Sequence, residues 1–285
     1  MDEKNDLLKN GASLASSSAG KSTAAAALRA SIRSGTFVGR TTSGLAEGFA
    51  QANLCILPYE LAFDFLLFCQ RNPKPCPLIA VLEKGEFLVP GDMTGGSTPA
   101  NVRTDVPSYR IFRDGVLEKE VAELGEEVWR DDLVTFVIGC SFSFEEALIR
   151  AGIPLRHVQQ QLNVPMFNTT IPCTPAGVFS GNMVVSMRPM TPANAIRATQ
   201  VTARYARVHG APVHIGDPMT IGITDILRPD YGDSVEVKEG EVPVFWACGV
   251  TPQAVVMKSK PHYCITHSPG MMLVLDVTNE TLSLD

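Results

Sequence analysis

The residues best suited to chemistry are concentrated between His209 and Gly270. This stretch holds His209, His214 and His267 together with Asp217 and Asp230, and most of them lie next to Gly or Pro. Gly and Pro favour fixed turns, which present polar side chains at the ends of elements. Binding and catalytic residues are common in such loops when a rigid scaffold holds them. The stretch is therefore the first candidate for a functional site.

Three of these residues could hold a metal ion. Imidazole and carboxylate ligands suit zinc or manganese, so His209, His214 and Asp217 are a tentative divalent-metal set. On a straight strand the two histidines would point to opposite faces, but the Gly-Ala-Pro bend between them could cancel that separation. The alternative is that each histidine is a hydrogen-bonded turn residue.

The carboxylates and the histidines are also candidate acids and bases. Clustered carboxylates raise one another's pKa, so Asp217, Asp230 and, more weakly, Asp233 could act as a general base. His214 is a second candidate base, and His267 in Thr266-His-Ser-Pro-Gly270 could be an acid or a base. Asp beside Pro or Gly is equally typical of a turn, and His267 could equally cap one.

Two cysteines occupy similar turns between a strand and a helix. Leu133–Ile138 is an apolar run typical of a buried strand, followed by Gly139-Cys140-Ser141 and a helix over 144–151 capped by Ser143 and Glu146. Residues 242–247 predict a second strand, with Cys248-Gly249 as its turn and Thr251-Pro252 opening a helix. We call these turns the Cys140 elbow and the Cys248 elbow.

The elbows could bind an anion, because a helix N-terminus offers free amide groups and lowers a thiol pKa. Cys140 is a candidate catalytic thiol, and Ser141, Cys248 and Gly249 are candidate substrate contacts. Each cysteine could instead be a small buried residue. Arg188, at the end of an apolar strand over 183–187, could clamp a carboxylate, and Asp105 is a further candidate substrate contact.

Composition limits the class of protein. The chain has 285 residues, 45% of them hydrophobic, and a net charge of −6, which gives no basic field for nucleic acid. Seven scattered cysteines suit reduced thiols. The acidic, polar start resembles neither a secretion signal nor a transit peptide, and no apolar run is long enough to span a membrane. These features predict a cytoplasmic protein with a small ligand, and the elbows, Arg188 and the resemblance described below point to a carboxylate or amino acid.

Alternating strand and helix patterns predict an α/β fold. We expect a mixed sheet, with parallel pairings, in a three-layer α/β/α core, plus a smaller α+β subdomain that contains an Asp114-Gly115 hairpin. Residues 1–21 are predicted to be a mobile low-complexity tail, and residues 22–285 the folded domain. Pro58 should open a helix whose apolar positions recur at helical spacing.

The order of the motifs resembles a known family. The motifs are Arg103-Thr-Asp-Val-Pro-Ser-Tyr109, Gly139-Cys-Ser-Phe-Ser-Phe-Glu145, Val185-Ser-Met-Arg-Pro189, 209–218, Pro229-Asp-Tyr-Gly-Asp233 and 245–253. Together they resemble the bacterial hydro-lyase family, whose domain is shared with mitochondrial D-glutamate cyclase. The resemblance covers Gly35 to the C-terminus.

The resemblance implies a hydro-lyase that converts D-glutamate to 5-oxo-D-proline and water. We assign Asp217 or His214 as base, Arg188 as the carboxylate anchor and Cys140 as facing the reacting carboxyl. Two alternatives stay open. One is a metal-dependent amidohydrolase or formamidase, because residues 209–217 are similar to the His-x-Gly-Thr-His-x-Asp motif with two extra residues. The other is a non-catalytic carboxylate-binding protein. A homo-oligomer is compatible with either.

Overall fold

The fold was determined as a computed structural model that describes residues 24–39, 41–90 and 99–283. The tail expected over residues 1–21 lies outside these ranges. A first helix runs through residues 24–33. The elements that follow are β1 (Phe49–Pro58), α2 (Tyr59–Arg71), β2 (Leu78–Val81), β3 (Tyr109–Arg113), β4 (Val116–Val121), β5 (Leu133–Gly139), α4 (Phe142–Arg150), α5 (Arg156–Gln159), β6 (Met166–Pro172), β7 (Asn182–Met190), α6 (Pro192–Ala203), β8 (His214–Ile215), β9 (Val242–Ala247), α7 (Thr251–Ser259), β10 (Cys264–His267) and β11 (Leu273–Thr278). Three short 3-10 helices, η1 (Ala206–Val208), η2 (Pro218–Ile221) and η3 (Glu280–Leu282), complete the described chain.

The larger sheet has seven strands in the order β2-β5-β1-β10-β3-β4, with β11 also paired to β1. Every residue of β1 and β5 is buried, as expected for strands covered on both faces. Their register places Asn53 opposite Ile138 and Ala52 opposite Gly139. On its other side β1 pairs with β10, with Cys55 opposite Thr266. Strand β1 therefore lies between the Cys140 elbow and His267.

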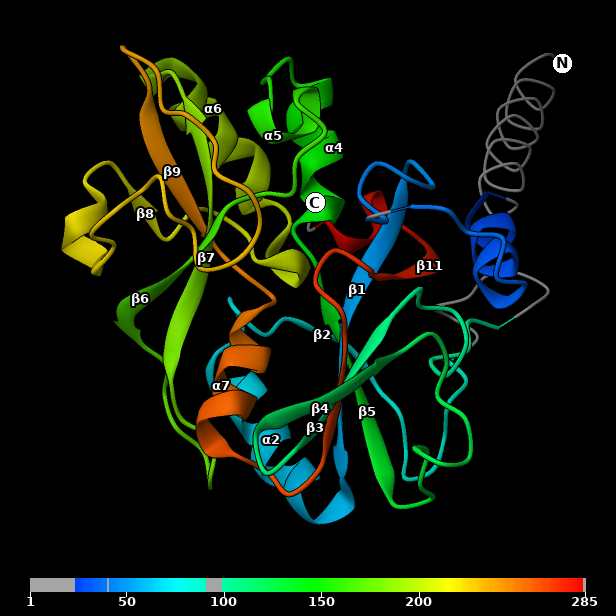
Figure 1. Cartoon of the computed structure of the whole chain (residues 1–285). Helices are drawn as coiled ribbons and strands as arrows, with labels where there is room; N and C mark the ends of the chain where they lie inside the picture. The colour runs from blue at the N-terminus through cyan, green and yellow to red at the C-terminus, as the bar shows by residue number, and fades with distance from the viewer. Residues whose placement is uncertain (1–23, 40, 91–98, 284–285) are drawn as a thin grey trace, which may run out of the picture.

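The smaller sheet has four strands in the order β6-β7-β9-β8. Ala247, the last residue of β9, pairs with Val185 of β7, so the Cys248 elbow begins where this pairing ends. Figure 1 shows the two sheets side by side, with α4, α5 and α6 toward the top of the view and α2 and α7 toward the bottom. Each elbow thus follows a strand of a different sheet.

The strand pairing corrects one expectation. The protein is α/β in content, but every pairing between the described strands is antiparallel, so the expected parallel pairings are wrong. Alternating strand and helix patterns do not fix strand direction, because a helix can also lead the chain to another sheet. Helix α4 does this: it follows β5 of the larger sheet, and the chain then enters β6 of the smaller one.

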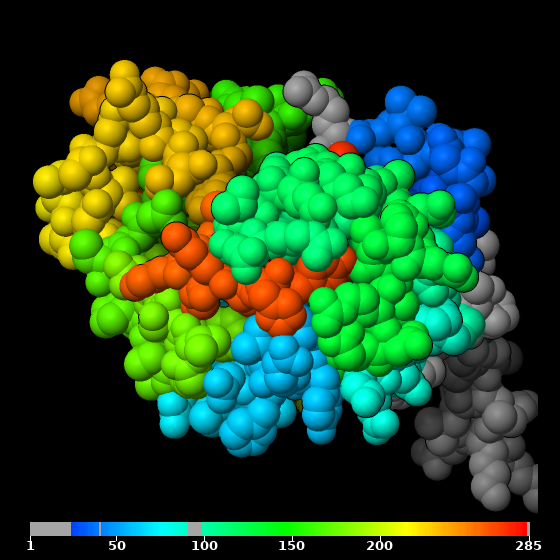
Figure 2. All heavy atoms as spheres, turned by 60° about the horizontal axis from the view of Figure 1, so that its bottom comes forward, coloured from blue at the N-terminus to red at the C-terminus, as the bar shows by residue number. Residues whose placement is uncertain are grey.

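Helices cover both faces of the larger sheet. Helix α2 packs on β1 and β5 with Phe65 and Phe68 fully buried, and Phe65 makes an edge contact with Phe136 at 4.8 Å between ring centroids. Helix α4 covers the other side of β1 and also contacts α6, where Phe144 lies 5.8 Å from Trp246 of β9. In Figure 2, α7 and the segment after it lie between the β3–β4 hairpin and α2. Apolar burial of this kind is the main force that holds the sheets together.

Local sequence signals succeed where the chain forms its own turns. Asp114 and Gly115 both have positive φ, 51° and 77°, and connect β3 to β4 as the hairpin predicted. The capping box expected at Ser143 and Glu146 is wrong. Helix α4 begins at Phe142, so Ser143 lies within it and its Oγ accepts the N–H of Gln51 at 3.3 Å. The Ser143 hydroxyl, which the local pattern assigned to a helix cap, therefore bonds to Gln51, a residue far away in the sequence.

The first described helix is tied to the domain through Asp105. This carboxylate is fully buried, and it accepts two hydrogen bonds from Arg33, at 2.5 and 2.6 Å, and one from the N–H of Asn101 at 2.8 Å. Arg29, also fully buried, lies 3.6 Å away and reaches Asp276 at 2.7 Å. Asp105 thus joins a helix and a loop, and does not line the cavity described below.

Replacing Asp105 should destabilise the fold. Asp105→Asn keeps the shape but removes the charge that offsets a buried arginine, which should lower the free energy of unfolding by about 3 kcal/mol. Urea denaturation at pH 7 measures this change. The control is Glu118→Gln, which breaks an exposed pair with Arg113 and should cost less than about 1 kcal/mol. Equal effects of the two substitutions would contradict a structural role for Asp105.

Candidate active site

The two elbows meet at one small cavity of about 30 Å³. Residues from both sheets form its wall, although they are far apart in the sequence. The polar and sulfur-bearing ones are Asn53, Cys140, Ser141, Asn163, Met166, Cys248, His267 and Met272. The structure therefore brings together five of the residues expected from the sequence: Cys140, Ser141, Cys248, Gly249 and His267.

The two elbows have the same local geometry. The sulfur of Cys248 accepts the N–H of Val250 at 3.5 Å, and the sulfur of Cys140 accepts the N–H of Phe142 in the same way. In each case the thiol bonds to the amide two residues later and so holds the turn ahead of a helix. The similarity seen in the sequence is thus a similarity of structure.

This geometry leaves one amide free at each elbow. Across the described residues, no acceptor is present for the N–H of Ser141 or of Gly249, the residues that directly follow the two cysteines. Both amides lie at the N-terminal end of a helix, where backbone dipoles favour a negative charge. A carboxylate or an oxyanion in the cavity would satisfy them.

Asn53 connects the two elbows. Its Nδ2 donates to the carbonyl of Gly139 at 2.9 Å, just before Cys140. A Cβ on Gly249 would collide with the Asn53 amide, so the Cys248 elbow approaches this side chain as closely as only glycine permits. Gly139 is equally confined, because a Cβ there would lie 2.6 Å from the carbonyl oxygen of Arg207.

His267 faces the cavity as a neutral ring. Its Nδ1 accepts the N–H of Leu54 at 3.1 Å, which places the ring proton on Nε2. The side chain is 1% exposed, and burial lowers its pKa to about 4. At neutral pH His267 is therefore a hydrogen-bond donor through Nε2, and it carries no charge.

Both cavity thiols are also neutral, which corrects an expectation. Burial raises the pKa of Cys140 far above the usual value for a thiol, and burial raises that of Cys248 to about 11. Loss of hydration outweighs the helix N-terminus that was expected to lower the Cys140 pKa. The seven cysteines of the chain are all unpaired and buried. Cys140 and Cys248 therefore present S–H groups to the cavity.

A buried charge cluster supports the Cys140 elbow from behind. Glu145 accepts two hydrogen bonds from Arg188, at 3.1 and 2.5 Å, and its Oε1 lies 3.0 Å from Nε2 of His157. Arg188 also donates to Ser141 Oγ at 3.2 Å and to Ser186 Oγ at 2.9 Å. Burial alone would raise the Glu145 pKa, but His157 and Arg188 hold it at about 2. Glu145 is thus ionised at neutral pH.

Arg188 therefore acts on the elbow and does not line the cavity. Its side chain is fully buried and lies between the rings of Phe144 and Trp246, each 5.2 Å away. Arg188, which was expected to anchor a carboxylate, is thus joined to the Cys140 elbow by its hydrogen bond to Ser141.

The tentative metal ligands do not come together. His209 is fully buried, and its Nδ1 bonds the carbonyl of Lys74 at 2.7 Å; burial lowers its pKa to about 4. His214 lies on β8, where Nε2 bonds the backbone carbonyl of Asp217 at 2.8 Å. Within residues 24–39, 41–90 and 99–283, no three His, Cys, Asp or Glu side chains form a metal-ion group.

The expected carboxylate bases lie on exposed turns away from the cavity. Asp217 accepts the N–H of Met219 at 2.9 Å and begins η2. Asp230 and Asp233 accept the amides of Asn168 and Asn163, each at 2.8 Å. These contacts match the turn alternative for each residue.

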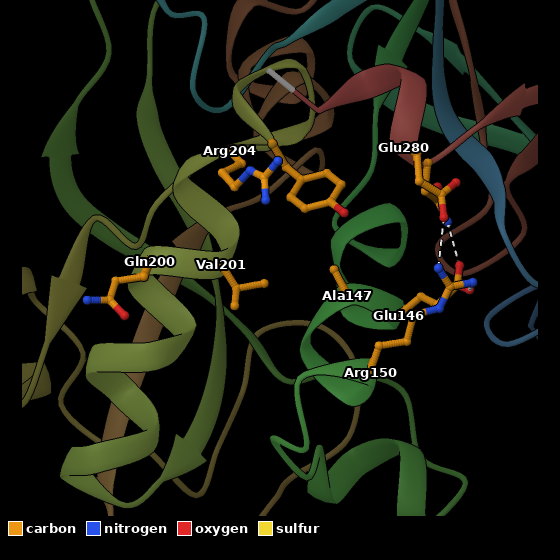
Figure 3. A pocket seen from close by; sticks show the side chains of 9 residues that line it. Glu146, Ala147, Arg150, Gln200, Val201, Arg204 and Glu280 are labelled. Carbon is orange, nitrogen blue, oxygen red and sulfur yellow. Dashed lines mark hydrogen bonds and ion pairs between the residues drawn. The ribbon is translucent and has the colours of Figure 1, made fainter. Parts of the chain in front are cut away.

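Other hollows surround the cavity. One of about 390 Å³ lies between α4 and α6, where Figure 3 shows Gln200, Val201 and Arg204 across from Ala147 and Arg150. Three of its charged groups are paired, because Arg150 donates to Glu280 at 2.8 Å and contacts Glu146. None of the site residues expected from the sequence lines it. The cavity between the elbows is therefore the better candidate site.

Several residues of the site were missed in the sequence. The sequence patterns predicted no role for Asn53, Phe142, Glu145 or His157. Asn53 sits in a buried apolar run, where a polar side chain needs a partner. That signal could have found it. Nothing local in the sequence shows that His157 meets Glu145.

These features define an α/β protein in which two elbows, one from each sheet, line a small cavity. The chain belongs to the D-glutamate cyclase family. The sequence profile of that family matches residues 134–276. A protein of Azorhizobium caulinodans named "Putative hydro-lyase" is 60% identical over 90% of this chain and 92% of its own. Bpet2233 of Bordetella petrii, with the same name, is 57% identical over 90% of this chain and 95% of its own.

A solved structure, a nitrogen repressor-like protein of Methanococcus jannaschii, is 9% identical, with a TM-score of 0.36 over 75% of this chain and 80% of that one. This likeness is too low to carry an argument. In the described ranges, no helix has the length and apolar character needed to cross a membrane.

Two of the buried histidines, His209 and His267, should make stability depend on pH. Their folded pKa values of about 4 lie below the ordinary value of 6.5, so the unfolded chain binds more protons between these limits. Stability is therefore complete above pH 6.5 and falls as the pH drops toward 4. His267→Gln should reduce this dependence by about 1.4 kcal/mol per pH unit. Urea denaturation between pH 7 and 5 measures it, and an unchanged slope would contradict a neutral buried His267.

Proposed function

We propose that this hydro-lyase family member converts D-glutamate to 5-oxo-D-proline and water in the cavity between the elbows. The observation that carries the proposal is the convergence of two free helix-terminal amides and the Nε2–H of neutral His267 on one buried cavity. Neutral donors from three residues that line one cavity suit an oxygen that gains negative charge during a reaction. The family membership supplies the substrate.

The reaction needs such donors at its central step. The amine nitrogen attacks the side-chain carboxyl carbon, a C–N bond forms, and the carboxyl oxygens carry the charge of a tetrahedral intermediate. The C–O bond to one oxygen then breaks, and that oxygen leaves as water. We assign the stabilisation of the remaining oxygen to the Ser141 and Gly249 amides together with His267.

The proton balance explains why neutral side chains suffice. The substrate begins with an ammonium and a carboxylate and ends as an amide and water, so two protons move from nitrogen to the departing oxygen. No proton is gained or lost overall. A site that excludes water favours the uncharged amine and acid over the zwitterion, which brings the reactants closer to the transition state. Ring closure is intramolecular, so holding the two ends together supplies much of the rate.

The geometry supports different roles from those first assigned. Asp217 and His214 lie on an exposed turn of the smaller sheet and do not line the cavity. Arg188 supports Ser141 and is not free to bind substrate directly. We propose His267 and the elbow amides as the groups that contact the reacting carboxyl, with Asn53 positioning both elbows.

Proton NMR tests the proposed reaction. Purified protein is incubated with D-glutamate, L-glutamate or 5-oxo-D-proline, each with manganese or with a chelator. We expect interconversion of the D pair alone. Turnover that requires the metal would favour the metal-dependent alternative, and no change in any sample would contradict the proposal.

Gly249→Ala should remove activity while keeping the fold. The new Cβ collides with Asn53 and displaces the elbow amide, and loss of one such donor lowers kcat by about 100-fold. The control is Gly125→Ala, whose Cβ meets only the flexible side chain of Glu127. Circular dichroism checks folding, and NMR turnover checks activity. Equal activity of the two variants would exclude the Gly249 amide from the reaction.

A further inference from the structure

The cavity between the elbows is too small for a whole substrate. A volume of about 30 Å³ holds about one water-sized group. A glutamate molecule is several times larger, so only its reacting carboxyl fits there. The rest of the molecule needs space that is continuous with the cavity.

A larger hollow lies directly beside it. This hollow has a volume of about 340 Å³, within the usual range for small-ligand sites, and we call it the chamber. Its wall comes from the loop before β1, from β1 itself, from α4 and from the segment after α5. Its apolar residues include Leu45, Phe49, Ile149, Val158 and Leu162, and its polar and charged ones include Glu47, Gln51, Glu145, Glu146 and Arg150.

The side chain of Phe142 is common to both walls. Two further contacts show that cavity and chamber adjoin. Thr41 of the chamber donates to the carbonyl of Gly270 of the cavity at 3.1 Å, and Leu162 of the chamber precedes Asn163 of the cavity. Phe142 thus lies at the partition between the two spaces.

Phe142 is suited to this position. It is the first residue of α4, directly after the free amide of Ser141, so its backbone is held by the elbow. Its ring is half-buried against a small apolar cluster that includes Val164, Met166 and Cys248. Two side-chain torsions can move the ring while this backbone stays in place.

We propose that the chamber receives the amino-acid substrate and that Phe142 is the specificity-determining residue that admits only its carboxyl end to the cavity. The identity of the ligand rests on the proposed function. The Phe142 ring determines how far the reacting carboxyl in the cavity lies from the chamber. It therefore also determines which length of substrate side chain brings the amine and the reacting carboxyl together. The ligand class is therefore a short acidic amino acid, and one more methylene should be disfavoured.

Thiol labelling tests the partition without relying on turnover. Cys140 and Cys248 line the cavity, so neutral iodoacetamide must pass Phe142 to reach them from the chamber. Phe142→Ala should raise their labelling rates by about tenfold or more, as followed by peptide mass spectrometry. Cys55 and Cys264, which are 1% and 0% exposed in the core, report any general loosening. Ile149→Ala, which changes only the chamber wall, is the matched control and should leave the labelling rates of all four cysteines unchanged.

Substrate choice gives the second readout. Phe142→Ala should raise the ratio of turnover of D-2-aminoadipate to that of D-glutamate by about tenfold, the usual effect of one methylene. Phe142→Leu should give a smaller change in the same direction, and it replaces the alanine variant if that variant does not fold. Unchanged cavity labelling would overturn the inference. Unchanged labelling with normal D-glutamate turnover would leave the proposed function intact, whereas faster labelling without wild-type turnover would support the partition and reject the substrate.

Discussion

The buried ion pair of Glu145 and Arg188 links α4 to the smaller sheet, within an interface that is held mainly by apolar packing. Glu145 belongs to α4, which follows the larger sheet, and Arg188 belongs to β7 of the smaller one. Removing either partner would leave a full charge inside the protein, which costs far more than an exposed charge does. Because Arg188 also donates to Ser141, the same interaction that docks the sheets fixes the Cys140 elbow. The packing of α4 against β7 and the position of the Cys140 elbow therefore depend on the same side chain, Arg188.

The ion pair of Glu145 and Arg188 does not line the cavity, although Glu145 lines the neighbouring chamber. The charges of Glu145 and Arg188 compensate each other behind the elbow, while Asn53, Cys140, Cys248 and His267 face the cavity without charge. A cavity of neutral donors is compatible with a substrate whose reacting ammonium and carboxylate groups carry opposite charges. It also keeps the interior from attracting free ions that would compete for the amides.

The sequence predicted the parts of the site that are formed locally. Strand, turn and helix follow one another at both elbows, so Cys140 and Cys248 could be placed at helix N-termini, and the Asp114-Gly115 turn could be placed in a hairpin. Strand direction could not be predicted, because it depends on which strands pair across long separations. The predicted lowering of the Cys140 pKa was wrong for a similar reason, because the burial that raises this pKa depends on the packed fold. His209, His214 and Asp217 share a motif in the sequence but have different partners in space.

The separate origin of the elbows has a consequence for folding. Residues 53, 140 and 267 lie on, or directly follow, neighbouring strands of the larger sheet, whereas residue 249 follows β9 of the smaller sheet, so the cavity wall is complete only when both sheets have docked. Contacts of such high sequence separation require closure of long loops and form slowly. Each sheet can acquire its hydrogen bonds without forming the cavity. Competence for ligand is therefore gained at the last step of assembly, when the second sheet meets the first, and it is the earliest property lost when the two separate.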